Sequence, residues 1–254
     1  MRESSSRILL EVAIASADDA EAAQNAGADR VELNSALLLG GLTPSLGTLI
    51  EARARIQIPI IAMVRPRGGG FAYSEAEFAS MLRDVRLFLD HGADGVAFGC
   101  LDDGGRVNHS RCAQIISLLG NDRDVVFHRA FDVTPDPVEA LETLIALGVR
   151  RVMTSGQEDS AYNGAARIKA LIEQSAGRIE ILPAGGINAF TVEDVLARTG
   201  CDQIHASLKT SKRDGSTTAR PNVSFGGTLK PAEDRYDTTD PTAVATLRGR
   251  LGRS

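Results

Sequence analysis

Short apolar stretches recur along the whole chain, and longer segments rich in alanine, leucine and charged residues separate them. Most of the short stretches are continuous apolar runs rather than alternations of apolar and polar residues, which is typical of parallel strands covered on both faces. The longer segments have helical character. The pattern predicts eight strands, at Ile8–Ile14, Arg30–Leu33, Pro59–Val64, Gly95–Gly99, Asp124–His128, Arg151–Thr154, Ile179–Pro183 and Gln203–Ala206.

One phrase, Gly-Ala-Asp or a close variant, occurs four times, beginning at Gly27, Gly92, Gly148 and Gly200. In each copy the glycine follows a helical segment and an apolar run comes directly after. Glycine tolerates the left-handed backbone that closes a helix, so each copy predicts a helix end, a tight turn and a strand. The copies lie about 50–65 residues apart, roughly twice one strand–helix unit, and therefore mark every second strand.

Helix starts carry their own signals. A side-chain acceptor followed three residues later by an acid is typical of a capping box, and proline is favoured at the first helical position. Capping-box patterns occur at Ser16–Asp19, Ser74–Glu77 and Thr191–Asp194, and proline stands near expected helix starts at Pro44, Pro135 and Pro241.

Eight strands alternating with about eight helices predict an α/β fold, a single closed (β/α)8 TIM barrel over residues 1–254. The alternative is an open doubly wound sheet, but no GxGxxG follows the first strand. One long loop, at about 209–240, is rich in Ser, Thr, Gly, Pro and charged residues, and a connection of this length indicates a lid or a disordered insertion. The segment Pro241–Leu251 is expected as a closing helix.

Composition narrows the class of protein. The net charge of −5 disfavours a nucleic-acid partner, which needs clustered Lys and Arg. No apolar run approaches the 18 or so residues of a membrane span, and no signal-peptide core follows the first residues. The three cysteines, an odd number without CxxC spacing, indicate a reducing compartment. We expect a cytoplasmic protein with no membrane partner.

TIM barrels carry their chemistry at the carboxyl ends of the strands, and here these positions are polar or glycine-rich. The candidate catalytic residues are Glu11, Glu32 and His128. An unpaired carboxylate in an apolar strand is costly, so the two glutamates are either a proton-transfer pair with separated pKa values or buried struts paired with arginine. His128 is either a general acid/base or a core histidine bonded to a backbone carbonyl.

Anion-binding chemistry is indicated at two places. Arg65 and Arg67 stand before three glycines and could clamp a carboxylate or phosphate, or else form loop ion pairs. The turn at Gly185 and Gly186, with Ser207 after the next strand, matches the usual phosphate site of this architecture. The other candidates for binding a substrate or anion are Asn34, Arg129, Asp132, Ser155, Asn188 and His205.

The cysteines give a weaker signal for a metal site. Thiolates are natural ligands of Cu(I), yet only Cys100 lies at an expected strand end and is a candidate metal ligand. Cys112 falls in an expected helix and Cys201 in a turn. The alternative for each is a small buried apolar side chain.

Several motifs together are specific to one family: residues 32–36, 39–45, 63–69, 73–78, 127–132, 154–156, 185–188 and 205–207. With Arg-Pro-Arg-Gly-Gly and Phe-His-Arg-Ala-Phe-Asp as the most specific, they resemble the CutC family from about Ile8 to Leu208. This resemblance implies a TIM barrel, a cytoplasmic location, a homodimer or higher homo-oligomer, and copper homeostasis with Cu(I) binding. Many relatives have cysteine where this chain has Asn34, and an amide is a poor replacement for a Cu(I) thiolate.

Three functions follow as hypotheses. The first is copper homeostasis through Cu(I), which the resemblance implies. The second is a barrel enzyme that acts on a small anionic or phosphorylated molecule by acid/base chemistry. The third is a barrel that binds such a molecule without catalysis. Whether the chain is an enzyme stays open at this point, as do its substrate and reaction.

Overall fold

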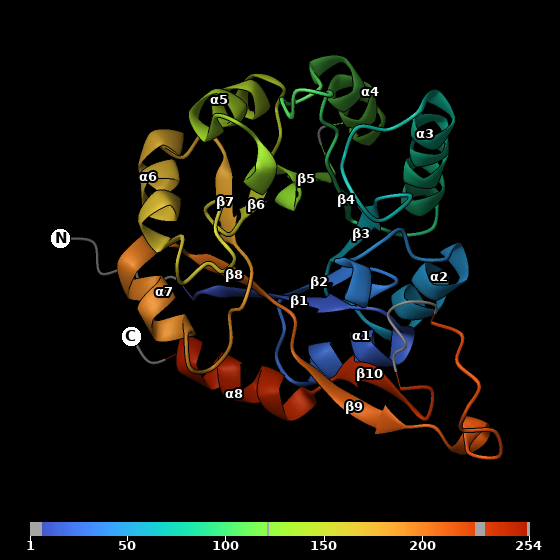
Figure 1. Ribbon diagram of the computed structural model, residues 1–254. Helices are drawn as coiled ribbons and strands as arrows, with labels where there is room; N and C mark the ends of the chain where they lie inside the picture. The colour runs from blue at the N-terminus through green and yellow to red at the C-terminus, as the bar shows by residue number, and fades with distance from the viewer. Residues whose placement is uncertain (1–6, 121, 227–231, 253–254) are drawn as a thin grey trace.

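The computed structural model describes residues 7–120, 122–226 and 232–252, and the chain forms a barrel ringed by helices (Figure 1). The parallel strands pair in the order β7-β6-β5-β4-β3-β2-β1-β8, and β7 and β8 also contact each other, which closes the ring. The strands are β1 (Leu9–Ile14), β2 (Arg30–Leu33), β3 (Ile60–Val64), β4 (Gly95–Phe98), β5 (Asp124–Phe127), β6 (Arg151–Thr154), β7 (Glu180–Pro183) and β8 (Gln203–Ala206).

All eight expected strands are confirmed, with bounds that shift by one residue at most. Almost every strand position is buried, as expected where helices cover the outside of the barrel and side chains fill its inside. The helices are α1 (Ala17–Asn25), α2 (Leu46–Arg55), α3 (Glu75–Asp90), α4 (His109–Leu119), α5 (Pro137–Ala146), α6 (Ala165–Ser175), α7 (Val192–Thr199) and α8 (Pro241–Leu251), with 3-10 turns η1 (Leu37–Leu39), η2 (Arg129–Val133) and η3 (Gly215–Thr217).

The repeated glycines have the backbone that their pattern predicts. The φ angles are +99° at Gly27, +94° at Gly92, +78° at Gly148 and +71° at Gly200, all in the left-handed region. Each glycine follows a helix by one or two residues and precedes an even-numbered strand by three. The repeat is therefore a scaffold element that turns the chain from helix to strand.

The helix starts agree only partly with the expected signals. The capping box at Ser74 and Glu77 is complete, whereas Thr191 makes no side-chain cap to the first turn of α7. Pro44 and Pro135 lie before the helices rather than inside them. Helix α5 instead begins at Pro137, because the preceding aspartate accepts hydrogen bonds from the free backbone N–H groups of the first turn.

The segment at 209–240, expected as a long loop, contains an antiparallel ribbon of β9 (Lys209–Arg213) and β10 (Arg235–Thr239). Figure 1 shows this ribbon running past α1 and away from the barrel opening, so its described part does not form a lid. Asp19 of α1 anchors it, since its carboxylate accepts from Thr238 Oγ1 and the Thr239 N–H, both at 2.7 Å. The ribbon is therefore held by backbone hydrogen bonds between its two strands and by Asp19, and not by a buried apolar face.

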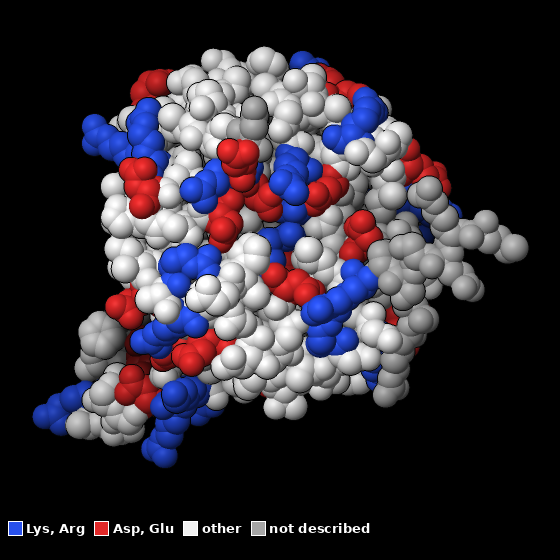
Figure 2. All heavy atoms as spheres, turned by 180° about the vertical axis from the view of Figure 1, so that it is seen from behind, with Lys and Arg blue, Asp and Glu red and all other residues white. Residues whose placement is uncertain are grey.

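A buried ion network lies at the amino ends of the strands. Arg151 on β6 is 3% exposed and pairs with Asp124 at 3.1 Å and Glu180 at 2.7 Å. Gln203 on β8 accepts from both Arg151 and Arg30. Buried charges persist only when paired in this way. The face in Figure 2 likewise shows acidic and basic groups side by side rather than in separate patches.

Candidate functional site

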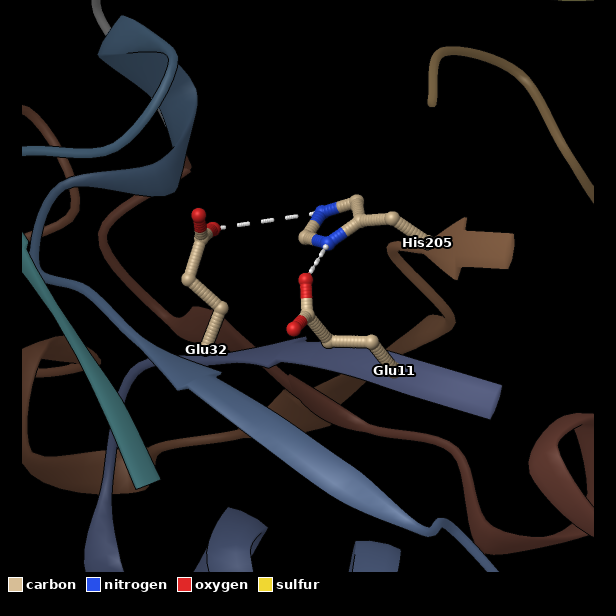
Figure 3. Close-up of side chains that lie close together, drawn as sticks. All are labelled: Glu11, Glu32 and His205. Atoms are coloured by element: carbon tan, nitrogen blue, oxygen red, sulfur yellow. Dashed lines mark hydrogen bonds and ion pairs between the residues drawn. The ribbon is translucent and has the colours of Figure 1, made fainter. Parts of the chain in front are cut away.

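Two glutamates and a histidine meet inside the barrel (Figure 3). Parallel pairing places Glu11 of β1 beside Arg30 of β2 and beside His205 of β8. His205 Nδ1 lies 2.8 Å from Glu11 Oε1, and His205 Nε2 lies 3.9 Å from Glu32 Oε2. Arg30 donates to the other oxygen of Glu11. The His205 ring therefore connects the two carboxyl groups, with Arg30 behind them.

The surroundings push the pKa values of these groups apart. Burial would raise the pKa of Glu11, but Arg30 and His205 hold it far below the usual range, so Glu11 is a carboxylate. Burial, reinforced by the charge of Glu11, raises the pKa of Glu32. Burial would lower the pKa of His205, but both glutamates raise it. These shifts favour the ionised form of Glu11 and the protonated forms of Glu32 and His205.

The same three residues offer ligand atoms within 4.8 Å of one another, a spacing that suits a metal ion. However, both oxygens of Glu11 already have partners, one in His205 and one in the guanidinium of Arg30. Arg30 supplies the positive charge that a metal would bring. The arrangement is better suited to moving a proton between Glu32 and His205 than to holding a cation.

A small cavity of about 80 Å³ opens above Glu32, at the carboxyl ends of the strands. Glu32 Oε1, Arg65 Nε and His128 Nε2 are buried without a hydrogen-bond partner in the described part of the chain. All three residues line this cavity. Unpartnered buried polar atoms are rare and each costs about 1–3 kcal/mol. The residues that line the cavity are Glu32, Gly40, Met63, Arg65, Phe71, His128, Arg129 and Met153.

The two arginines of the expected clamp lie in different places. Arg65 is buried, its guanidinium donates to the backbone carbonyls of the η1 loop and of Gly69, and it lies over the Phe71 ring at 5.1 Å. Arg67 does not line the cavity and pairs with Glu77 at 2.6 Å. Arg65 thus lines the cavity and has a buried Nε without a hydrogen-bond partner in the described part of the chain, and Arg67 fixes the glycine loop.

Arg129 reaches the cavity from η2 and is held by Asp132 and Ser155. Its Nε donates to Asp132 at 2.7 Å and its Nη2 to Ser155 Oγ at 2.7 Å. The Asp132 carboxylate also accepts from the Ser155 N–H, so it acts as a positioning group rather than an anion ligand. Gly185 adopts a φ of +99°, and a Cβ there would lie 3.4 Å from Arg129 Nη1. The glycine turn therefore leaves room at the exposed side of this guanidinium.

The other candidates lie around this centre. Asn34 Nδ2 donates to Glu32 Oε2 at 2.9 Å, so Asn34 orients the glutamate. Asn188 shapes the loop after β7 by donating to the Gly186 carbonyl and accepting from the Phe190 N–H. Ser207 is exposed after β8. Their role in binding an anion stays a prediction.

The cysteines are placed among apolar side chains. Cys100 and Cys112 are fully buried in the main core, and Cys201 is 5% exposed. The Cys112 thiol and burial raise the pKa of Cys100, and burial raises that of Cys201. Cys100 is absent from the lining of the cavity. These environments favour the thiol over the thiolate that Cu(I) requires.

Sequence reasoning missed four residues of the cavity lining. These are Gly40, Met63, Phe71 and Met153. Met63 and Met153 sit in apolar strands, where a thioether looks like any core side chain. Arg30 agrees with the expectation that an arginine pairs with a buried glutamate, and its signal was a charged residue that begins an otherwise apolar strand.

Fold and geometry together define a TIM-barrel protein with a small cavity, lined by a few polar groups among apolar ones, at the carboxyl ends of its strands. The CutC family model matches residues 8–210, and the chain belongs to the CutC family. A CutC family protein of Treponema denticola is 48% identical over 230 residues, which cover 91% of this chain and 93% of the relative.

Two further comparisons agree with this assignment. The human copper homeostasis protein cutC homolog is 41% identical over 239 residues, covering 94% of this chain and 87% of the relative. The crystal structure of the copper homeostasis protein CutC from Streptococcus agalactiae is 32% identical with a TM-score of 0.74, and the match covers 78% of this chain and 97% of that one. Among the described residues, none of the helices has the length and apolarity to cross a membrane.

Proposed function

We propose that this protein binds a small anionic organic molecule in the cavity above Glu32 and transfers a proton to or from it. The observation that carries this proposal is that three residues lining one cavity, Glu32, Arg65 and His128, each have a buried polar atom without a hydrogen-bond partner among the described residues. A ligand that bonds to them recovers the cost of burying them unpaired. Small-molecule sites have this form, a few polar groups converging in a mostly apolar pocket.

The charges support an anionic ligand. Arg65 and Arg129 both line the cavity, and Arg129 is the more accessible, with 42% of its side chain exposed. Arginine presents a planar donor fork that matches a carboxylate or phosphate. The anionic group of the ligand therefore lies at Arg129, beside the open turn at Gly185, and the reacting part lies deeper, at Glu32.

The relay behind Glu32 supports proton transfer rather than binding alone. Glu32 and His205 both have raised pKa values and stand next to a fixed carboxylate in Glu11, and a carboxyl group whose pKa is raised in this way is suited to exchange a proton with a ligand. His205 takes the proton from Glu32 and is held in position by Glu11 at 2.8 Å. Glu32 is thus the proposed catalytic residue, and His205 and Glu11 are positioning residues.

Thermal denaturation with oxalate, pyruvate and inorganic phosphate tests the binding. We expect at least one of these anions to raise Tm and the increase to be lost in Arg129→Gln. Arg55→Gln is the matched control, since Arg55 has a similar exposure of 39% and lies on α2, outside the cavity lining. A panel without any stabilising anion, or a Tm increase that survives Arg129→Gln, would refute the proposed anion site.

Copper handling, named in the mammalian relatives, is the second candidate, and one observation favours it. The thioethers of Met63 and Met153 line the cavity, and thioethers are soft ligands that suit Cu(I). The guanidinium groups of Arg65 and Arg129 in the same lining oppose a cation, and the buried thiols offer no thiolate. The residues present therefore fit Cu(I) less well than an anion.

Competition for Cu(I) against a chromophoric chelator separates the two candidates. We expect affinity no tighter than that of ordinary protein thiols. Tight binding that is lost in a Met63→Leu, Met153→Leu double variant and kept in Cys100→Ala would establish copper as the ligand of this cavity.

The buried, unpaired state of the cysteines also supports a reducing, cytoplasmic location for the protein.

A further inference from the structure

The His128 ring has a defined tautomer. His128 precedes η2, and its Nδ1 accepts a hydrogen bond of 3.0 Å from the Ala130 N–H. A ring nitrogen that accepts from a backbone N–H cannot carry a proton itself. The proton of the neutral ring is therefore on Nε2, the atom that is buried, unpartnered and part of a residue lining the cavity. This buried Nε2–H is a neutral donor on a residue of the cavity lining.

Packing fixes this ring and keeps it neutral. A Cβ on Gly99 would lie 2.7 Å from His128 Nδ1, so glycine is required for the ring to sit against β4. The Phe71 ring covers it, with centroids 5.1 Å apart. Burial and the charge of Arg65 lower the pKa of His128 to about 3. The imidazole is thus an uncharged donor with a fixed direction, unlike a general acid that titrates near neutral pH.

A fixed donor and a proton acceptor on the walls of one cavity suit a particular ligand. The Nε2–H of His128 needs an acceptor, and Glu32 Oε1 needs a group that can give or take a proton. A carbonyl compound offers both, in its oxygen and in the hydrogen on the adjacent carbon. Neutral imidazole is an effective electrophile for a carbonyl oxygen because it stabilises developing negative charge without becoming charged itself.

We propose that the ligand is a small carbonyl compound, that His128 donates its Nε2–H to the carbonyl oxygen, and that Glu32 removes a proton from the adjacent carbon. This inference rests on the proposed function and adds the substrate class and the electrophile. At about 80 Å³ the cavity has room for on the order of five water molecules, which corresponds to a compound of a few carbon atoms.

The step balances without a further reactant. The C–H bond next to the carbonyl breaks, its electron pair forms a C=C bond, and the π electrons of the carbonyl move onto oxygen. His128 Nε2–H and Arg65 Nε–H stabilise the enolate oxygen, and the proton goes to Glu32. Return of the proton to the same carbon restores the substrate. In a hydroxycarbonyl, return of the proton to the former carbonyl carbon, with transfer of the hydroxyl proton to the enolate oxygen, completes an isomerisation.

Hydrogen exchange in D₂O tests the inference. Pyruvate, hydroxyacetone and glyceraldehyde are incubated with the protein, and proton NMR measures the loss of the signals next to the carbonyl. We expect at least one compound to exchange faster than in buffer. The rate should fall about 100-fold or more in Glu32→Gln and in His128→Asn, which are typical losses for a general base and for one oxyanion donor. Arg55→Gln should keep the rate.

The outcomes separate this inference from the proposed function. Stabilisation by oxalate, a planar mimic of an enolate, without exchange in any of the three compounds leaves the anion site standing and overturns the carbonyl chemistry. Exchange that survives His128→Asn, with Tm unchanged, overturns the role of His128. A protein that shows no stabilisation by any anion and no exchange with any compound would refute the proposed function and this inference together. Asparagine at 128 keeps an oxygen for the Ala130 N–H, so loss of the cap is not the reason for lost exchange.

Discussion

The loss of stability on acidification tests whether the buried His128 imidazole stays neutral in the folded protein. In the folded protein its pKa is about 3, against 6.5 for an ordinary histidine. Between these values the unfolded chain binds a proton at this residue and the folded protein does not. Stability therefore rises with pH across this window, is fully present above pH 6.5, and is lost as the pH falls toward 3.

The magnitude follows from the size of the shift. For a histidine that stays neutral in the folded protein, each pH unit below 6.5 lowers the free energy of unfolding by about 1.4 kcal/mol. Lowering the pH from 8 to 5 therefore reduces the free energy of unfolding by about 2 kcal/mol through His128 alone. His205 acts in the opposite direction: its raised pKa gives a contribution that is complete below 6.5 and is lost as the pH rises through the folded value. The glutamates with lowered pKa values lose their contribution only in more acidic solution.

Urea unfolding of the wild-type protein and His128→Asn at pH 8 and pH 5 isolates the histidine. Asparagine does not titrate and still accepts from the Ala130 N–H, while His205 remains in both proteins. We expect the wild type to lose about 2 kcal/mol more than the variant over this interval. Equal losses would show that His128 titrates normally, and the argument for a fixed neutral donor would then fail.

Three other substitutions test the scaffold. Gly99→Ala forces a Cβ to within 2.6 Å of the Ala130 Cβ and against the His128 ring, so urea unfolding should show a loss of about 1–3 kcal/mol, whereas Gly68→Ala, which meets nothing within 4 Å, should be nearly neutral. Arg151→Met leaves two carboxylates without their buried partner and should cost about 3–5 kcal/mol by the same measurement; a loss below 1 kcal/mol would contradict a buried network. Asp19→Ala removes the anchor of the β9–β10 ribbon, so amide exchange in the ribbon should accelerate while the barrel strands stay protected; uniform acceleration would show instead that the whole fold had weakened.

The barrel could be predicted because its signals are local. A continuous apolar run is a buried parallel strand wherever it occurs, and a glycine after a helical segment closes that helix whatever follows. The ribbon at 209–240 could not be predicted in the same way. Its strands have no apolar face, and their stability comes from pairing with each other and from Asp19, almost 220 residues away in the sequence.

The candidate site, like the fold, could be predicted from the sequence only in part. Sequence position alone indicated Glu11, Glu32 and His128, because charged and titratable groups in apolar strands need a reason to be there. It could not tell Arg65, which faces the cavity, from Arg67, which pairs with Glu77, since both follow the same strand. The difference lies in which carbonyls and carboxylates the folded loop brings within reach.

The sequence by itself determined the alternation of strands and helices, the family, and the titratable groups placed inside the barrel. Only the tertiary structure decided the pKa shifts and hydrogen-bond partners of these titratable groups. Barrel closure brings β8 beside β1, so that His205 joins two glutamates from distant parts of the chain. The tautomer of His128 and the raised pKa values of Glu32 and His205 depend on contacts and burial, which no local pattern of residues specifies.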